Sequence, residues 1–248
     1  MKVVEIFKNI QGEGIYSGCQ TVFVRLAGCN LACEWCDTKY ALQGKSKKYC
    51  HRDIIKEVES LNPPPMTIAF TGGEPMIYQK GLLRKTVKLL KIHGYEIHFE
   101  TNGTIPPGGS LKRDVDFWSV SPKLQYDFGK IYPPSKVSYL ESVKAFCTLE
   151  SEKQLKFVIA KEEEVPLIFN LIEMMELPDE VVKSLPIVVQ PERYTFTKVR
   201  GVSFGTERDL YLDGFDELIE WCEKHLRGLN WRVLPQLHYL LWKGERSK

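Results

Sequence analysis

The chain has 248 residues, of which 43% are hydrophobic and 27% are charged, and its formal net charge at pH 7 is +2. This composition is typical of a globular protein, and because no stretch is long and apolar enough to span a bilayer, we expect no membrane association. Lys and Arg nearly balance Asp and Glu without a long basic run, which argues against a nucleic-acid partner and favours a small-molecule substrate.

Short β-rich runs alternate with longer segments whose apolar residues have helical spacing. The predicted strands are Val3 to Phe7, Thr21 to Leu26, Thr67 to Phe70, Glu96 to Glu100, Phe117 to Val120, Leu155 to Ile159 and Pro186 to Val189. The predicted helices are Asp53 to Leu61, Lys80 to His93, Lys136 to Phe146, Glu164 to Glu176 and Phe215 to Leu226. This alternation predicts an α/β fold with a largely parallel sheet, whose reactive groups lie in the loops after the carboxyl ends of the strands.

The length suits one domain over residues 1–248, although two are possible. Within it, residues 193–213 are predicted to form a hairpin insertion or a mobile loop, and residues 241–248 a C-terminal tail. The start, Met1 to Phe7, lacks the basic-then-apolar layout of a signal peptide, so we expect a cytoplasmic protein.

Three of the seven cysteines follow the second predicted strand. Cys29, Cys33 and Cys36 have the spacing C-x-x-x-C-x-x-C, close enough for one loop to surround a single metal centre with three thiolates. A structural zinc site usually closes with a fourth protein ligand, whereas a catalytic centre keeps one position open. Three ligands in one loop therefore favour a catalytic metal centre.

The other four cysteines fall into two groups. Cys19 and Cys50, together with His51, could complete a structural zinc site, and on ligand type alone this alternative stays open. Cys147 and Cys222 lie in helical apolar patterns and are predicted to be small core residues. An odd number of cysteines, three of them in one loop, suits reduced thiols rather than a secreted disulfide framework.

Further polar motifs follow other predicted strands. Gly73 and Glu74 come after the third strand, where paired glycines let the amine of a ligand approach the sheet edge closely. Ser121 and Lys123 follow the fifth strand and offer a hydroxyl and a cation to a carboxylate or ribose, with a solvated loop as the alternative. Gln190 ends another strand, within reach of an adenine edge.

With Trp35 directly before the third cysteine, the cysteine spacing resembles that of the radical S-adenosylmethionine (SAM) superfamily. The resemblance implies a [4Fe-4S] cluster on the three cysteines, whose fourth iron is chelated by SAM and whose electron cleaves SAM to a 5′-deoxyadenosyl radical. It also implies a SAM-binding set, which comprises Trp35, Asp37, Gly73, Glu74, Ser121, Lys123 and Gln190.

The chain before and after the cysteines carries a second set of polar residues. Gln11, Gly12 and Glu13 join the first strand to the second, where a turn explains the glycine but not its two neighbours. Arg25 precedes the first ligand cysteine by four residues and carries a guanidinium fork that can clamp a carboxylate, with a surface ion pair as the alternative. Thr38 offers a hydroxyl to a hard cation such as Mg²⁺, with helix capping as the alternative.

Taken along the chain, these elements resemble the 7-carboxy-7-deazaguanine synthase family. The matching elements are Q-G-E-G from Gln11, Arg25, G-C-N-x-x-C-x-x-C-D-T, T-G-G-E-P, E-T-N-G-T at Glu100 to Thr104, S-P-K, and Gln236 with His238. The resemblance runs from Phe7 to His238 and implies a partial βα barrel of the radical SAM type in a compact variant, assembled as a homodimer. For such an enzyme we expect a reducing electron donor such as flavodoxin or ferredoxin.

By this resemblance the substrate is 6-carboxy-5,6,7,8-tetrahydropterin, and ring contraction yields 7-carboxy-7-deazaguanine plus ammonia on the way to queuosine and other 7-deazapurines. The reaction implied starts with hydrogen abstraction from C6 of the pterin, and Mg²⁺ held in part by Thr38 bridges the substrate carboxylate. The implied substrate-binding residues are Ile10, Gln11, Gly12, Glu13, Arg25, Thr71 and His238.

Three features depart from the family pattern. Residues 193–213 are longer than the corresponding connection in compact members, and the tail at 241–248 runs past the usual ending, so contacts made by the chain end of relatives are not carried over. Tyr239 stands where a basic residue often follows the histidine, which would alter the charge of the pocket or the packing of a dimer.

Two other functions compete with this interpretation. A radical SAM activase, which generates a glycyl radical on a partner protein, shares the short chain and the cysteine motif. Against it stand Gln11, Glu13 and Arg25, because a clamp of this kind suits a small carboxylate better than a peptide backbone. The second competitor is a zinc-binding protein that uses the same cysteines without catalysis.

Overall fold

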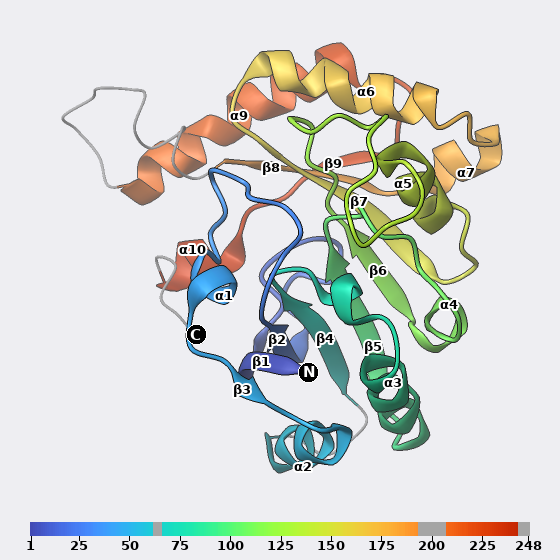
Figure 1. The fold of residues 1–248 in the computed structure, drawn as a ribbon. Helices are drawn as coiled ribbons and strands as arrows, with labels where there is room; N and C mark the ends of the chain where they lie inside the picture. Colours follow the sequence, from blue (N-terminus) through green and yellow to red (C-terminus); the bar gives the residue numbers. More distant parts are fainter. Residues whose placement is uncertain (62–65, 193–206, 243–248) are drawn as a thin grey trace.

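The computed structural model describes residues 1–61, 66–192 and 207–242. Nine strands form one sheet in the order β3-β1-β2-β4-β5-β6-β7-β8-β9, and β3 and β9 are its two edges, so the sheet is an open, partial barrel, as predicted (Figure 1). The strands are β1 (Lys2–Ile10), β2 (Gln20–Leu26), β3 (Lys47–Lys48), β4 (Thr67–Gly72), β5 (Glu96–Thr101), β6 (Phe117–Val120), β7 (Glu152–Ile159), β8 (Ile187–Pro191) and β9 (Trp231–Val233).

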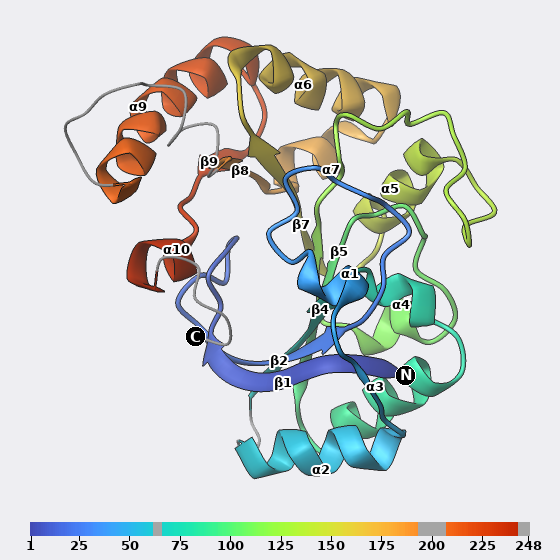
Figure 2. The ribbon, with the colours of Figure 1, turned by 60° about the vertical axis from the view of Figure 1, so that its left-hand side comes forward.

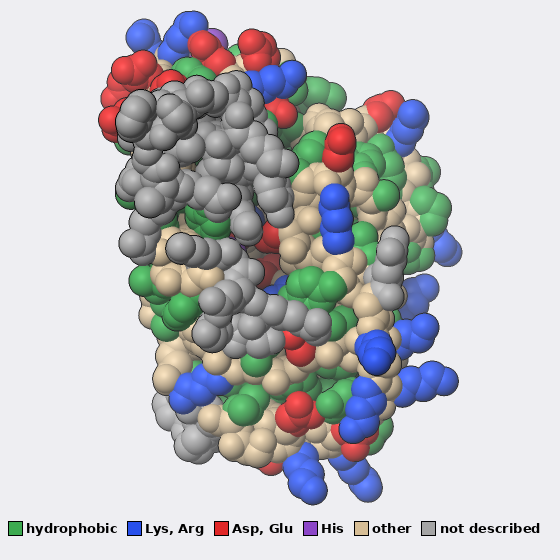
Figure 3. Space-filling view, turned by 90° about the vertical axis from the view of Figure 1, so that its left-hand side faces the viewer, with side chains coloured by type: hydrophobic (Ala, Val, Ile, Leu, Met, Phe, Trp, Pro, Cys, Tyr) green, Lys and Arg blue, Asp and Glu red, His purple; other side chains and the backbone are tan. Residues whose placement is uncertain are grey.

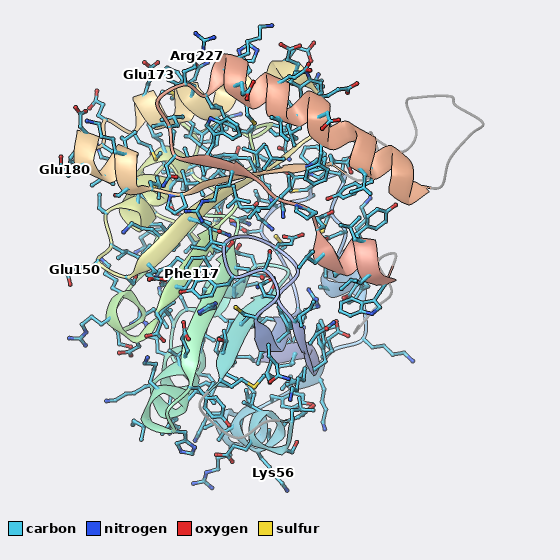
Figure 4. All side chains as sticks on the ribbon, turned by 180° about the vertical axis from the view of Figure 1, so that it is seen from behind. Lys56, Phe117, Glu150, Glu173, Glu180 and Arg227 are labelled. Carbon is cyan, nitrogen blue, oxygen red and sulfur yellow. The ribbon has the colours of Figure 1, made fainter. Side chains whose placement is uncertain are left out.

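The helices are α1 (Tyr40–Gln43), α2 (His51–Leu61), α3 (Leu82–Ile92), α4 (Leu111–Asp114), α5 (Tyr139–Cys147), α6 (Val165–Met174), α7 (Asp179–Ser184), α9 (Glu207–His225) and α10 (Leu237–Trp242), with 3₁₀ turns at Pro75–Tyr78 and Glu162–Glu164. The longer ones, α2, α3, α5, α6 and α9, pack their buried side chains on the outer face of the sheet. Charged side chains such as Lys56, Glu173 and Arg227 point outward at the periphery (Figure 4). Within the described ranges no helix is long and apolar enough to cross a membrane.

The direction of the strands agrees with the prediction of a largely parallel sheet. β1 is antiparallel to both of its neighbours, β2 and β3, whereas β2 runs parallel to β4 and each strand from β4 to β9 runs parallel to the next one in the sheet. The loops that leave the carboxyl ends of these parallel strands therefore emerge at the same end of the sheet. The cysteine loop and the predicted glycine, S-P-K and Gln190 motifs all lie at that end.

The prediction for residues 207–213 was wrong, because this part of the expected insertion begins helix α9. The helix continues through Gly214, which weakens a helix interior by about 1 kcal/mol relative to alanine. Tyr211 offsets this cost, since its side chain is fully buried and its ring centroid lies 5.5 Å from that of Phe215 and 5.1 Å from that of Tyr239. Burial in the tertiary structure outweighs local helix propensity here.

The remaining differences concern short or undescribed segments. Residues 193–206 and 243–248, which hold the rest of the predicted insertion and most of the predicted tail, lie outside the described ranges. The strands β3 and β9 and the helices α1, α4, α7 and α10 were not predicted, because segments of two to six residues are too short to show a period. Every strand and helix that was predicted is present.

Apolar side chains on the outer face of the sheet form the core beneath the helices. Phe70, Phe99 and Trp118 are in register on β4, β5 and β6, with ring centroids 5.1 Å apart at each step, and Trp118 meets Phe146 of α5 at 5.0 Å. Cys147 of α5 belongs to the same buried cluster, as does Cys222, which confirms that both are core residues.

Polar side chains occupy the opposite, inner face of the same strands, because side chains alternate along a strand. Arg25 pairs in register with Thr71, and Glu100 pairs with Ser119, which pairs with Gln154. A row of polar groups across five strands of a largely buried sheet has no role in packing the core. The inner face, at the carboxyl ends of the strands, is therefore where the functional site is built.

Candidate active site

The three predicted ligand cysteines lie in the loop that follows β2. Cys29, Cys33 and Cys36 are each partly buried and carry no disulfide, and the Cys36 N–H donates to the Cys33 carbonyl at 3.3 Å, which closes a turn between two of them. Burial raises the pKa of Cys29 to about 11 and also raises the pKa of Cys36. These two thiols therefore stay protonated at neutral pH unless a metal ion replaces their protons.

The cysteine sulfur atoms are not spaced for one shared zinc ion. Zn–S bonds of 2.3 Å in a tetrahedral site require sulfur atoms about 3.8 Å apart. Among the described residues, which include all seven cysteines, only Glu13, Asp37 and His238 bring three ligand atoms within 4.8 Å of one another. The zinc site considered with Cys19 and Cys50 is not formed, and both of these cysteines are exposed. A [4Fe-4S] cluster, in which each thiolate binds its own iron, does not require the three sulfur atoms to share one metal ion.

The glycine pair after β4 allows two backbones to approach closely. A Cβ atom on Gly73 would lie 1.9 Å from the carbonyl oxygen of Gly28, the residue before the first ligand cysteine. The Gly73 N–H donates to the Leu26 carbonyl at 2.9 Å, and the Glu74 N–H donates to the Gly28 carbonyl at 2.8 Å. Backbone hydrogen bonds thus join the T-G-G-E-P turn to the start of the cysteine loop. Contact between this turn and a ligand amine stays a prediction.

Glu74 is fully buried in the same turn. Its carboxylate accepts hydrogen bonds from Thr101 Oγ1 at 2.7 Å, from the Met76 N–H at 2.9 Å and from the Asn102 N–H at 2.6 Å. Burial raises the pKa of Glu74 to about 7 in spite of these donors. The side chain ties the ends of β4 and β5 together, so the predicted SAM contact would use a carboxylate that already has three protein partners.

Asn102, which was not among the predicted site residues, contacts the cysteine loop. Its Nδ2 lies 3.7 Å from Cys29 Sγ and donates to Asn30 Oδ1 at 3.1 Å. Its carbonyl accepts a hydrogen bond of 2.7 Å from the hydroxyl of Tyr139, which in turn accepts one of 2.8 Å from the Lys123 N–H. One buried hydroxyl therefore joins the loops after β5 and β6 behind the cysteines.

Glu100 connects two predicted substrate-binding residues that come from different elements. Gln11 Nε2 donates to Glu100 Oε1 at 2.8 Å, and Thr71 Oγ1 donates to Glu100 Oε2 at 2.6 Å. The sequence analysis quoted the motif of Glu100 but assigned it no role. The sequence does hold a signal for Glu100. It follows Phe99, whose side chain is fully buried between the outer face of the sheet and the helices, so the carboxylate of Glu100 must face the inner side.

Glu13 is the centre of a second network at the same end of the sheet. Its carboxylate forms an ion pair with Lys156 of β7 and accepts a hydrogen bond from Gln236 Nε2 at 2.5 Å. Burial by itself would raise the pKa of Glu13, but Lys156 and His238 lower it to about 2. The structure therefore brings together Glu13, Asp37 and His238, which belong to three separate sequence motifs. It also adds Lys156, which was not predicted.

The C-terminal region reaches this site by packing on the loop between β1 and β2. Ile10 ends β1, and the Leu237 N–H donates to the carbonyl of Gly12 at 2.8 Å. A Cβ atom on Gly12 would lie 2.5 Å from Nδ1 of His238, so the glycine is needed for this contact. Figure 2 shows α10 beside the β1–β2 loop, and Figure 3 shows acidic side chains in a recess of the adjoining surface.

Comparison with known sequences identifies the family. A sequence model of the radical SAM superfamily matches residues 23–118. The 7-carboxy-7-deazaguanine synthase of Pyrobaculum aerophilum is 30% identical over 249 residues, which cover 100% of this chain and 97% of that protein. The chain belongs to the 7-carboxy-7-deazaguanine synthase family. Another member, from Hyperthermus butylicus, is 33% identical over 201 residues, which cover 78% of this chain and 79% of that protein.

Two solved structures share the fold of this family member. QueE from Escherichia coli has a TM-score of 0.63 at 24% identity and covers 96% of this chain and 94% of its own. SuiB from Streptococcus suis, determined with its precursor peptide SuiA, has a TM-score of 0.53 at 12% identity and covers 89% of this chain and 50% of its own. These identities support the fold alone, and the predicted radical SAM architecture is confirmed.

Membership of the 7-carboxy-7-deazaguanine synthase family implies a [4Fe-4S] cluster and SAM, and the polar groups of the site fit both. Gln190 Oε1 is buried and has no partner in the described part of the chain, while its Nε2 lies 3.5 Å from the Pro235 carbonyl. The amino group of an adenine would satisfy that oxygen. Lys123 Nζ donates to Ser121 Oγ at 2.8 Å, and Trp35 and Lys123 line one narrow crevice.

Arg25 and Thr38 of this family member already have protein partners. Arg25 Nε donates to Glu5 Oε1 at 2.8 Å, so the ion pair considered as an alternative is present. Thr38 Oγ1 donates to Asp37 Oδ1 at 2.7 Å. Helix capping, the alternative for Thr38, is not observed, because the N-cap of α1 is Lys39 and makes no side-chain cap. The carboxylate clamp and the Mg²⁺ site stay predictions.

Proposed function

We propose that the protein is a radical SAM carbon–nitrogen lyase that converts 6-carboxy-5,6,7,8-tetrahydropterin to 7-carboxy-7-deazaguanine and ammonia, a step towards queuosine and other 7-deazapurines. Relatives that bear the synthase name over most of the chain support this proposal. The observation that carries it is the convergence of Gln11, Glu13 and Glu100 on the inner face, at the end of the sheet from which the cysteine loop leaves. Carboxylates and amides suit a pterin, whose aminopyrimidinone edge presents adjacent N–H donors.

The cofactors would be held by the cysteine loop and the loops beside it. Cys29, Cys33 and Cys36 would bind three irons of the cluster. Together, the cluster and SAM supply the carbon-centred radical that starts the reaction. The chain itself would orient SAM through Trp35, Asp37, Gly73, Glu74, Ser121, Lys123 and Gln190. In this set Gln190 would accept from the adenine, and the ammonium of Lys123 would face a carboxylate.

The pterin would be held by residues from the β1–β2 loop, the inner face of the sheet and α10. The proposed set is Ile10, Gln11, Gly12, Glu13, Arg25, Thr71 and His238, to which the structure adds Glu100. Arg25, and a Mg²⁺ ion held in part by Thr38, would face the 6-carboxylate of the substrate. Most of the contribution of the chain is then orientation and fixed charge, with little acid–base chemistry.

We also propose one domain over residues 1–248, a homodimer, a cytoplasmic location, and flavodoxin or ferredoxin as the reductant. The single-domain proposal is supported by one hydrophobic cluster that extends from Val3 to Leu226. The location is supported by the seven free thiols, which suit a reducing compartment. Sedimentation of the holoenzyme with and without the reductant protein would test the two assembly proposals.

The reaction is tested with anaerobic enzyme whose cluster has been reconstituted. SAM, dithionite, Mg²⁺ and 6-carboxytetrahydropterin are added, and the products are followed by mass spectrometry. We expect the deazaguanine acid with loss of ammonia from the substrate, and no product from Cys33→Ala. Formation of 5′-deoxyadenosine without the deazaguanine acid would refute the proposed substrate. An unchanged rate after removal of Mg²⁺ would refute the role of Thr38.

A further inference from the structure

Lys156 is a mostly buried cation on the inner face of β7. Its neighbours in the strand, Leu155 and Phe157, are buried in the core beneath the helices, so the alternation of side chains turns Lys156 towards the site. Its side chain is 14% exposed and pairs with the equally buried carboxylate of Glu13, which is 143 residues away in the sequence. A buried ammonium is costly unless it is paired, so this lysine needs an explanation.

The loop that carries Glu13 is held in place independently of Lys156. Gln154, two residues earlier on the same face of β7, accepts a hydrogen bond from the Ile15 N–H at 2.9 Å. The loop also packs tightly on that side chain, because a Cβ atom on Gly14 would lie 2.2 Å from Gln154 Nε2. Gln154 therefore positions the backbone of the loop, and Lys156 acts on the side chain of Glu13.

The two donors to Glu13 leave it able to bind a ligand with both oxygens. Gln236 Nε2 donates to Oε1, and Lys156 Nζ donates to Oε2. An ionised carboxylate has about four acceptor sites, so in the described structure one site on each oxygen is left for a ligand. Two parallel acceptors match two adjacent N–H donors, the pattern of an amidine, a guanidine or the aminopyrimidinone edge of a pterin.

Charge at this end of the sheet makes the orientation of Glu13 depend on Lys156. Glu13, Glu100 and Asp37 all act electrostatically on Lys156, and the other ammonium nearby is that of Lys123. Without Lys156 the carboxylates would face one ammonium group instead of two, Glu13 would lose its ion-pair partner, and repulsion would turn Glu13 away from its neighbours.

We infer that Lys156 is a positioning residue for substrate recognition, whose ammonium fixes the Glu13 carboxylate so that both of its oxygens face the N–H donor edge of a pterin. This inference rests on the proposed function and extends it to a residue that no motif indicated. Lys156 itself does not touch the reacting atoms in this role.

The test measures pterin binding in addition to turnover. Cluster-loaded protein with SAM, kept unreduced so that no reaction occurs, is titrated with 6-carboxytetrahydropterin in an anaerobic calorimeter. For Lys156→Met we expect the Kd to rise about 10-fold to 100-fold, as for loss of a charge-assisted contact, while the Kd for SAM stays unchanged. In steady-state assays KM should rise more than kcat falls.

Three further variants separate positioning from folding. Lys156→Arg keeps the charge and should restore most of the pterin affinity. Lys153→Met makes the same chemical change on the other face of β7, where Lys153 binds the carbonyls of Leu149 and Ser151, and should leave pterin affinity unaltered. In a Glu13→Gln background, Lys156→Met should have little further effect, because the lysine acts through Glu13.

The outcomes distinguish this inference from the proposed function. If the wild-type enzyme makes no deazaguanine acid, the proposed function is wrong and the inference falls with it. If the wild-type enzyme turns over and Lys156→Met binds pterin equally well, only the inference is wrong. A full additional loss of affinity in the Glu13→Gln background would also overturn it.

Discussion

Replacing Gly73 by alanine would show whether the turn after β4 sets the position of the cysteine loop. The new Cβ would lie 1.9 Å from the carbonyl oxygen of Gly28, 2.4 Å from its carbon and 3.1 Å from the Cys29 nitrogen. Ordinary contacts begin at 3.4 Å, so the two backbones must separate by roughly 1.5 Å. Neither partner is a flexible side chain that can rotate aside.

The structure gives the size of the effect. Overpacking of this kind costs about 1–3 kcal/mol, and separation of the backbones also weakens the bond between the Glu74 N–H and the Gly28 carbonyl, worth about 1 kcal/mol. We expect a loss of about 3 kcal/mol, which lowers the Tm of a chain of this length by on the order of 10 °C. Because Cys29 moves with Gly28, the variant should also incorporate less iron.

The assay compares thermal unfolding of the apoproteins and the iron and sulfide content after anaerobic reconstitution. Gly129→Ala is the matched control, since its Cβ would meet only Oδ1 of Asp127 at 3.2 Å, the end of a side chain that can rotate. A Gly73→Ala protein that keeps the wild-type Tm within about 2 °C and a full complement of iron would refute the reasoning.

Two other substitutions test the buried polar contacts of the site. Burial would raise the pKa of Glu13, but Lys156 and His238 outweigh it and hold the pKa at about 2, below the ordinary 4.5. Wild-type protein should therefore exceed Glu13→Gln in stability at pH 7 by on the order of 3 kcal/mol. In urea titrations this difference should be full above pH 4.5 and shrink as the pH falls towards 2; a difference independent of pH would contradict the assignment. In the same titrations, Tyr139→Phe should lower the free energy of unfolding by about 3 kcal/mol, because the Asn102 carbonyl and the Lys123 N–H lose their shared partner. A loss below about 1 kcal/mol would show that water or another group replaces the hydroxyl.

The sequence by itself determined the features that depend on neighbouring residues. Cys29, Cys33 and Cys36 lie within eight residues, so the length of the chain between them confines them to one loop wherever that loop is placed. The strands and longer helices were predictable for a similar reason, because the alternation of side chains and the helical period are read within one segment. The start of α9 was missed because burial of Tyr211, not local propensity, stabilises it.

Only the tertiary structure decided which of these segments meet. Periodicity shows that Lys156 faces the inner side of β7, but not that the loop carrying Glu13 lies over that side or that Gln236 reaches the same carboxylate. Glu100 likewise acquires its role from Gln11 and Thr71, which belong to other elements. The order of strands in the sheet sets these contacts. That order follows from the packing of the whole chain, and no single segment contains the information that determines it.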